Sequence, residues 1–171
     1  MKKTTLIALT ALAAIVLLVP SGSAMAQNQA SAQADATATI IAPITLTNTA
    51  DLQFGNVVAS TAAGTIVVDT AGGRTWTAGA TGISGLPVSA AAFTVGGGAN
   101  RTFTITLPAS TTITNGAENM TVDTFTSSLG ASSVLDGSGA AALAVGGTLT
   151  VNANQATGSY SGTFSVTVAY N

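Results

Sequence analysis

The chain contains no cysteine and no histidine among its 171 residues. Disulfides, Cys-His and Ser-His-Asp catalytic arrangements, and metal sites built on imidazole are therefore excluded. Charge is scarce too: charged residues make up 6% of the sequence, and apart from Lys2 and Lys3 the only cations are Arg74 and Arg101. Binding to nucleic acid or to an anionic membrane surface is not expected, because both need clustered Lys or Arg.

The first 26 residues have the pattern of a secretory signal peptide. Two lysines precede an apolar run over residues 6–19, and Ala24 and Ala26 are the small residues that a signal peptidase reads. We predict cleavage before Gln27. The apolar run is short of the roughly 20 residues that a membrane-spanning helix needs, so we expect no membrane span in the mature chain. The mature chain is therefore expected to be exported.

Alternation of polar and apolar residues dominates the rest of the sequence and indicates strands with one buried face. The clearest case is the final segment, in which Tyr160, Phe164, Val166, Val168 and Tyr170 share one face. Further strands are predicted at 52–58, 64–69, 91–95, 101–107, 120–126, 143–145 and 148–151.

Glycine-rich turns at 71–73, 96–98, 115–116 and 136–137 separate these strands. Helical patterns are scarce, and only the Ala-rich stretches 89–92 and 139–144 could form a helical turn. The predicted fold is an all-β, immunoglobulin-like antiparallel β-sandwich, with a closed barrel as the second choice.

The predicted mature N-terminus has an unusually long alternation. Every even position from Ala30 to Leu46 is apolar, which is too long for one ordinary strand. Pro43 cannot donate a ladder hydrogen bond, so it fits an edge or a break. We predict an N-terminal extension over residues 27–39, followed by a sandwich domain over residues 40–171 whose first strand is 40–46.

The acidic residues offer little chemistry. Glu118 and Asp123 could form an acid/base pair, and Asp69 and Asp136 could contribute to a calcium site, but turn and surface positions explain all four more simply. Trp76 could stack on a sugar, although an anchor in the core or at an edge is the better interpretation. We therefore predict no enzyme activity, no cofactor and no metal.

Five stretches carry a resemblance to a known family: DLQFGNVVAS, GTIVVDTAGGRTWTAG, AAFTVGG, LPASTTITNGAENMTVDTFTS and VGGTLTVNANQATGSYSGTFSVTVAYN. Together they resemble the bacterial family called domain of unknown function 4402. A looser resemblance is to chaperone–usher pilins and spore coat protein U. Like those proteins, this chain has a Gly fourteenth from the C-terminus (Gly158), a Tyr next to last (Tyr170) and an early Phe-Gly pair (Phe54-Gly55). It departs from them in one respect: pilins typically carry a Cys pair, and this chain has none.

The pilin resemblance implies a sandwich that lacks its final strand and accepts the N-terminal extension of a neighbour by β-strand addition. The expected function is that of a non-enzymatic subunit of a fimbria-like cell-surface assembly, with copies of itself, other surface subunits and periplasmic assembly factors as partners. The resemblance also implies export through the periplasm of a Gram-negative bacterium to the cell surface or the medium. The alternative is a self-contained binding or adhesion module. The residues expected to mediate assembly are Gly158, Tyr160, Phe164, Val166, Val168 and Tyr170 in the acceptor, and either the alanine-rich extension or Ile40, Ile44 and Leu46 in the donor.

Overall fold

The computed structural model describes residues 29–171, so the predicted signal peptide lies outside the described residues. Residues 29–43 are exposed and belong to no strand. Thr39–Asn171 form one compact unit. Within the described part of the chain, no helix is long and apolar enough to cross a membrane.

Over residues 29–171 every element is a strand, and every strand pair is antiparallel, which confirms the predicted all-β sandwich. The abundance of Thr and Val suits this fold, because β-branched side chains pack well on a pleated surface. The strands are β1 Thr45–Ala50, β2 Gln53–Ala59, β3 Gly64–Val68, β4 Arg74–Trp76, β5 Ala80–Ser89, β6 Ala91–Gly96, β7 Thr102–Thr106, β8 Ser110–Thr114, β9 Asn119–Ser127, β10 Ser132–Val134, β11 Ala140–Val151 and β12 Thr167–Tyr170.

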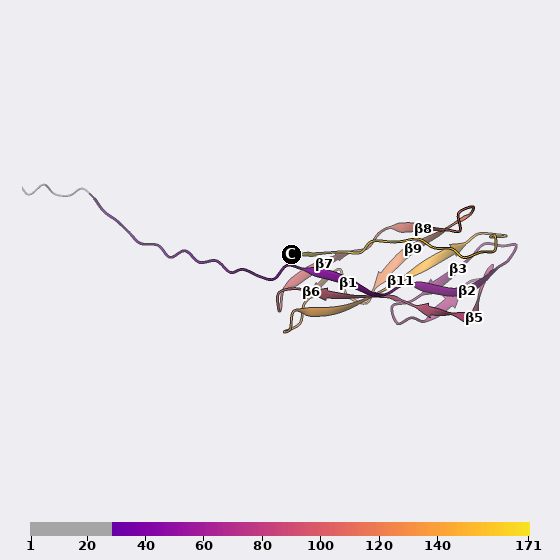
Figure 1. Cartoon of the computed structure of the whole chain (residues 1–171), viewed down its shortest axis with the longest axis horizontal. Coiled ribbons are helices and arrows are strands. Elements are labelled where there is room, and N and C mark those ends of the chain that lie inside the picture. The colour runs from indigo at the N-terminus through magenta and orange to yellow at the C-terminus, as the bar shows by residue number, and fades with distance from the viewer. Residues whose placement is uncertain (1–28) are drawn as a thin grey trace, which may run out of the picture. The chain divides into compact units, whose positions relative to one another are not determined.

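These strands form three sheets. The seven-stranded sheet has the order β1-β6-β11-β3-β4, with β9 also paired to β11 and β8 paired to β9. A three-stranded sheet has the order β10-β7-β12, and β2 and β5 form a two-stranded ribbon. Figure 1 shows β1, β6 and β7 at the end of the domain where the C-terminus lies, and β2, β3 and β5 at the opposite end.

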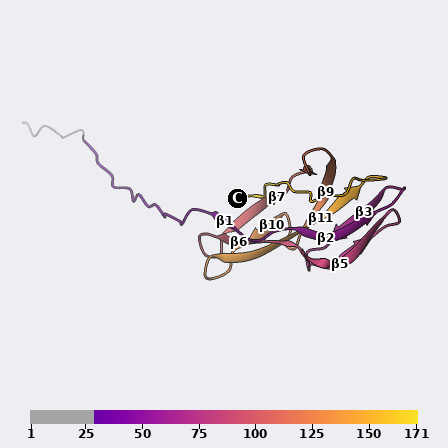
Figure 2. The same ribbon diagram turned by 45° about the vertical axis from the view of Figure 1, so that its right-hand side comes forward.

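The longest strand, β11, connects the two ends. At Val145 it pairs with β6 and β9 at once, and at Leu149 it pairs with β3 and β9 at once. β9 therefore lies on one edge of β11, while β6 and β3 follow one another along the other edge. The turned view in Figure 2 shows β11 in the middle of the domain, between the end that holds β6 and β7 and the end that holds β3 and β5.

Two hydrophobic clusters lie on this strand. Cluster 1 packs the first half of β11 and β6 against β7, and cluster 2 packs the second half of β11, β3 and β9 against the ribbon. Leu52 and Phe125 touch both clusters. The buried members of cluster 1 are Ala91, Val95, Phe103, Ile105, Leu135, Leu143 and Val145, and those of cluster 2 are Ile66, Ala80, Met120, Val122, Leu149 and Val151.

Gly146 and Gly147 mark the point where β11 changes neighbours. A Cβ on Gly146 would lie 2.4 Å from the backbone oxygen of Val68, where β3 begins to pair. A Cβ on Gly147 would meet the Phe125 ring at 3.3 Å and Leu52 at 3.4 Å. The two glycines therefore let β3 approach closely and leave room for the side chains shared by both clusters.

Several details of the predicted strands are wrong. The first strand begins at Thr45 instead of residue 40, and Ile40 is 98% exposed, because Pro43 cannot donate to a ladder and β1 first pairs with β6 at Thr45. The segments 143–145 and 148–151 are parts of one strand, β11. Both expected helical turns lie largely in strands, since pairing with neighbours overrides the weak helix preference of alanine. The strands β4, β5, β8 and β10 were not expected.

The C-terminal alternation is confirmed in its faces but not in its strand length. Tyr160, Phe164, Val166, Val168 and Tyr170 are all half-buried and pack on the clusters, while the residues between them are exposed. However, only Thr167–Tyr170 form a strand, β12, which pairs with β7. The residues before it follow an extended path with few backbone partners.

Tyr170 ties this last strand to two distant segments. Its hydroxyl donates to the Ala42 carbonyl at 2.9 Å and accepts from the Gly98 N–H at 2.6 Å. One phenol thus fixes the backbone that enters β1 and the turn that follows β6. The chain N-terminal to Ala42 leaves the domain beside the C-terminus.

Gly146→Ala is expected to destabilise the domain by about 2 kcal/mol, because the added methyl must displace the backbone of β3. Gly137→Ala is a matched control, since a Cβ there would have nothing within 4 Å. Urea unfolding of both variants measures the difference. Equal stability of the two would show that the change of neighbours at Gly146 does not constrain β11.

Tyr170→Phe is expected to cost about 1–2 kcal/mol of unfolding free energy, because it removes both hydrogen bonds of the hydroxyl. Amide hydrogen exchange of Gly98 should accelerate. Exchange of Gly97, whose N–H donates to the Gly139 carbonyl instead, should change much less. Unchanged exchange at Gly98 would contradict the assigned role of the hydroxyl.

Candidate functional site

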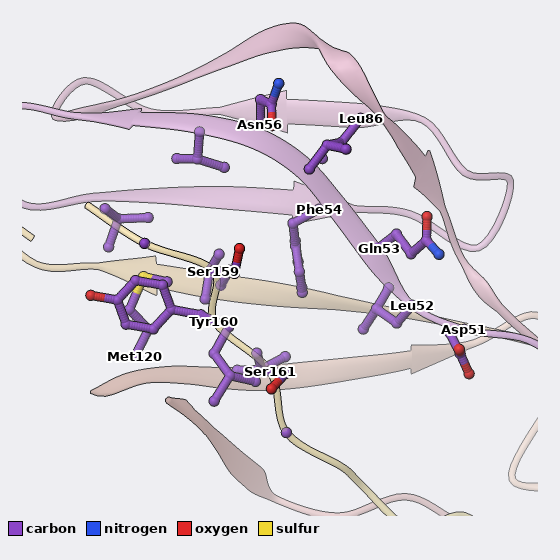
Figure 3. A pocket seen from close by; sticks show the side chains of 18 of the residues that line it. Asp51, Leu52, Gln53, Phe54, Asn56, Leu86, Met120, Ser159, Tyr160 and Ser161 are labelled. Carbon is purple, nitrogen blue, oxygen red and sulfur yellow. The ribbon is translucent and has the colours of Figure 1, made fainter. Parts of the chain in front are cut away.

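A groove opens over cluster 2, where the second layer of the sandwich is incomplete. Its cavity has a volume of about 1140 Å³. One border is residues 51–59, which include all of β2, and the opposite border is residues 155–164, here called the return segment. Figure 3 shows Leu52, just before β2, and Phe54 of β2 projecting toward the side of Met120 and Tyr160.

Both borders present a backbone edge to the groove. Every consecutive residue of 51–59 and of 155–164 lines the cavity, whereas a strand that presents a face contributes only alternate residues. β2 pairs with β5 along one edge, and no strand of the described chain pairs with its other edge. The groove is therefore bordered on the β2 side by a row of backbone groups without a ladder partner.

The return segment has its free side toward the same groove. Ser161 exchanges both backbone hydrogen bonds with Thr114 of β8, at 2.9 and 3.0 Å. Thr163 adds its carbonyl as acceptor for the Thr111 hydroxyl at 2.6 Å. Because successive backbone groups of an extended chain point to opposite sides, the N–H groups of Tyr160 and Gly162 point away from β8 and toward the groove.

The floor of the groove is apolar. It consists of cluster 2 residues from three strands, with Met120 and Val122 from β9, Leu149 and Val151 from β11, and Ile113 from β8. These side chains remain covered except for Ile113, which is half-buried. A segment bound in the groove would therefore lie on an apolar surface whose side chains are already mostly buried.

The rim is polar but nearly uncharged. Asn48, Gln53 and Asn56 contribute amides, and Asp51 is the one charged residue among those that line the groove. The arrangement offers backbone donors, backbone acceptors and apolar surface. It suits an extended polypeptide rather than an ion or a phosphate, which would need clustered charge or converging donors.

Arg74 holds the β2 wall in place. Between the pairs Phe54–Val88 and Asn56–Ile83, the single residue Gly55 lies opposite four residues of β5, so the ribbon bulges. The Arg74 guanidinium donates to the carbonyls of Phe54, Asn56 and Ile83 at 2.9, 3.1 and 3.0 Å. Gly55 has φ of 70°, and its lack of a side chain leaves room for the guanidinium.

The role of Arg74 was missed in the sequence, because its three acceptors are 9 to 20 residues away along the chain. Trp76 from the same strand lies with its ring centre 5.7 Å from the guanidinium carbon and is 48% exposed. The tryptophan ring thus lies half-exposed on strand β4, beside the cation that supports the groove.

The residues predicted to mediate assembly fall into separate groups. Gly158, Tyr160 and Phe164 line the groove. Val166, Val168 and Tyr170 lie further along and pack on cluster 1, together with Ile44 and Leu46. Ile40 contacts neither cluster and is exposed.

The predicted turn aspartates cap turns. Asp69 accepts from the N–H groups of Ala71 and Gly73 at 2.9 and 2.7 Å. Asp136 accepts from the hydroxyl of Ser138 and from the N–H groups of Ser138 and Ala140, which lowers the pKa of this carboxyl. Glu118 lies exposed before β9, and Asp123 lies within β9. Within residues 29–171, no group of three or more acidic side chains gathers in a way that could hold a metal ion.

The family model described as Domain of unknown function (DUF4402) matches residues 44–170. The chain belongs to this family. No curated protein and no solved structure matches the chain significantly. The DUF4402 domain begins at Ile44, the first residue packed on cluster 1, and contains both borders of the groove. The exposed residues 29–43 precede it.

Arg74→Lys is expected to destabilise the DUF4402 domain by about 2 kcal/mol, because an ammonium cannot bond three carbonyls in the geometry of the guanidinium. The loss of stability should be greatest in the ribbon, so hydrogen exchange should accelerate more at the amides of β2 and β5 than at those of β7. Arg101→Lys, on an exposed side chain, is the control and should change stability by less than about 0.5 kcal/mol. Similar losses in both variants would contradict this role.

Proposed function

We propose that the protein is an exported, non-enzymatic structural subunit of a cell-surface assembly that polymerises by β-strand addition into the groove. The observation that carries the proposal is the pair of backbone edges, 51–59 and 155–164, which face one cavity over an apolar floor. A strand placed between them could bond both edges at once, and the hydrogen bonds of β-strand addition supply affinity.

The composition supports this function. Export follows from the signal-peptide pattern of the first 26 residues. A subunit with 6% charged residues and few cations can bury much of its surface in a polymer at little electrostatic cost. An unprotected edge such as that of β2 is a site of association, because no charged side chain other than Asp51 lines it.

A second function uses the same groove. As a self-contained binding or adhesion module, the domain would hold an extended segment of a different protein. The amides of Asn48, Gln53 and Asn56 on the rim favour this alternative, because they could bond polar side chains of such a ligand. The oligomeric state of the protein separates the two functions.

The test is the solution mass of the protein, expressed with its own leader and purified after export, by light scattering over a range of concentrations. We expect large assemblies that grow with concentration. Ile113→Lys, which places a cation on the groove floor, should leave a folded monomer, because an inward-facing Lys blocks strand addition.

Val134→Lys is the matched control. Val134 is 57% exposed in β10 and does not line the groove, so this variant should assemble like the unaltered protein. Circular dichroism verifies that each variant is folded. If the unaltered protein is a monomer, the structural-subunit function is rejected and the binding-module function remains. If Ile113→Lys still assembles, the contact between subunits does not involve the groove floor.

A further inference from the structure

The predicted mature chain contains a single sulfur atom, and that atom belongs to the groove. The sequence has no cysteine, and two of its three methionines, Met1 and Met25, lie in the predicted signal peptide. The third, Met120 of β9, lines the groove. Resting on the proposed function, we infer that Met120 is a site of reversible oxidation by peroxides, and that its sulfoxide keeps a strand from entering the groove.

The Met120 side chain is accessible from the groove. It is 9% exposed, the largest exposed fraction among the buried core residues of the described chain, whereas Val122, Leu149 and Val151 on the same floor are no more than 2% exposed. Tyr160 of the return segment packs on the same cluster, and Figure 3 shows it on the side of Met120. A small oxidant that enters the empty groove therefore meets the thioether at its floor.

The reaction transfers one oxygen atom to the sulfur. A lone pair of Sδ attacks one oxygen of hydrogen peroxide, so that the S–O bond forms while the O–O bond breaks. The second peroxide oxygen takes up the proton of the first and leaves as water. The sulfur loses two electrons and the peroxide gains them. The product is a polar sulfoxide, which sulfoxide reductases convert back to the thioether.

The floor that the described residues form gives the new oxygen no hydrogen-bond donor. The floor side chains around Met120 are apolar. The hydroxyl of Tyr160 already donates to the Ala156 carbonyl at 2.8 Å. Because a buried polar atom without a partner is costly, the sulfoxide oxygen would turn toward the water in the groove. It would then occupy the surface on which the apolar face of an added strand has to lie.

An added strand would in turn protect the sulfur. The strand lies over the floor and displaces the water through which a peroxide reaches Met120. The strand and the sulfoxide oxygen need the same space, so each disfavours the other to the same extent. Oxidation therefore acts on subunits whose groove is empty and spares those whose groove is filled.

The test begins with peroxide treatment of the protein, expressed with its own leader and purified after export. Protein kept below the concentration at which it assembles should gain one oxygen atom on the peptide that contains Met120, as measured by mass spectrometry. Assembled protein should gain this oxygen at least about fivefold more slowly, because oxidation follows exposure of the sulfur.

Assembly is then measured by sedimentation over a concentration series. Oxidation should raise the concentration at half assembly by about tenfold, because the polar oxygen must lose its water when a strand enters. Treatment with a methionine sulfoxide reductase should restore the original value. Met120→Leu has an apolar side chain of similar volume without sulfur, and each variant is compared with its own untreated sample. Peroxide should leave the half-assembly concentration of Met120→Leu unchanged.

The outcomes are distinguishable. If Met120 is not oxidised, or if its oxidation leaves the half-assembly concentration as it was, the inference is overturned. An equal change in treated Met120→Leu would also overturn it, because the effect would then come from another residue. If the untreated protein does not assemble, the proposed function fails and the effect on strand entry fails with it, while the peptide mass still decides whether Met120 is the oxidised residue.

Discussion

The pairing of β11 with three other strands is the constraint on which the rest of the fold depends. One edge changes from β6 to β3 at the glycine pair while β9 holds the other edge, so a single strand carries both hydrophobic clusters. Above cluster 1 the second layer is the sheet of β10, β7 and β12. Above cluster 2 it consists of the β2–β5 ribbon and the return segment, which do not pair with each other. The groove is the space that this difference leaves.

The two borders of the groove are fixed by polar contacts rather than by packing alone. Arg74 replaces the missing ladder hydrogen bonds at the bulge of the ribbon. Ser161 and Thr111 hold the return segment against β8. Because these bonds use the side of each segment that faces away from the groove, both borders are ordered while their other sides stay open. A pre-ordered acceptor loses little conformational freedom when a strand enters.

Alternation in the sequence predicted the fold class and most of the long strands, because burial of one face leaves a period of two. It failed where the pattern is weak. β8 carries only one large apolar residue, Ile113, and β5 contains Gly and Pro, which normally indicate turns. The faces of the C-terminal segment followed from sequence, but its division into a groove border and a strand did not. Whether a part of this segment is a strand or a groove border depends on which backbone groups lie within hydrogen-bonding distance, and these come from residues far away in the sequence. The same holds for the role of Arg74.

The hydroxyl of Tyr170 has a mechanical consequence for a protein held by its N-terminal segment. A pulling force on residue 41 would reach the domain at the Ala42 carbonyl and pass at once to the last strand and to the turn after β6. The next resistance would be the β1–β6 ladder, loaded along the strands so that its hydrogen bonds share the force instead of opening singly. The chain would thus be anchored at the point where tension enters each subunit.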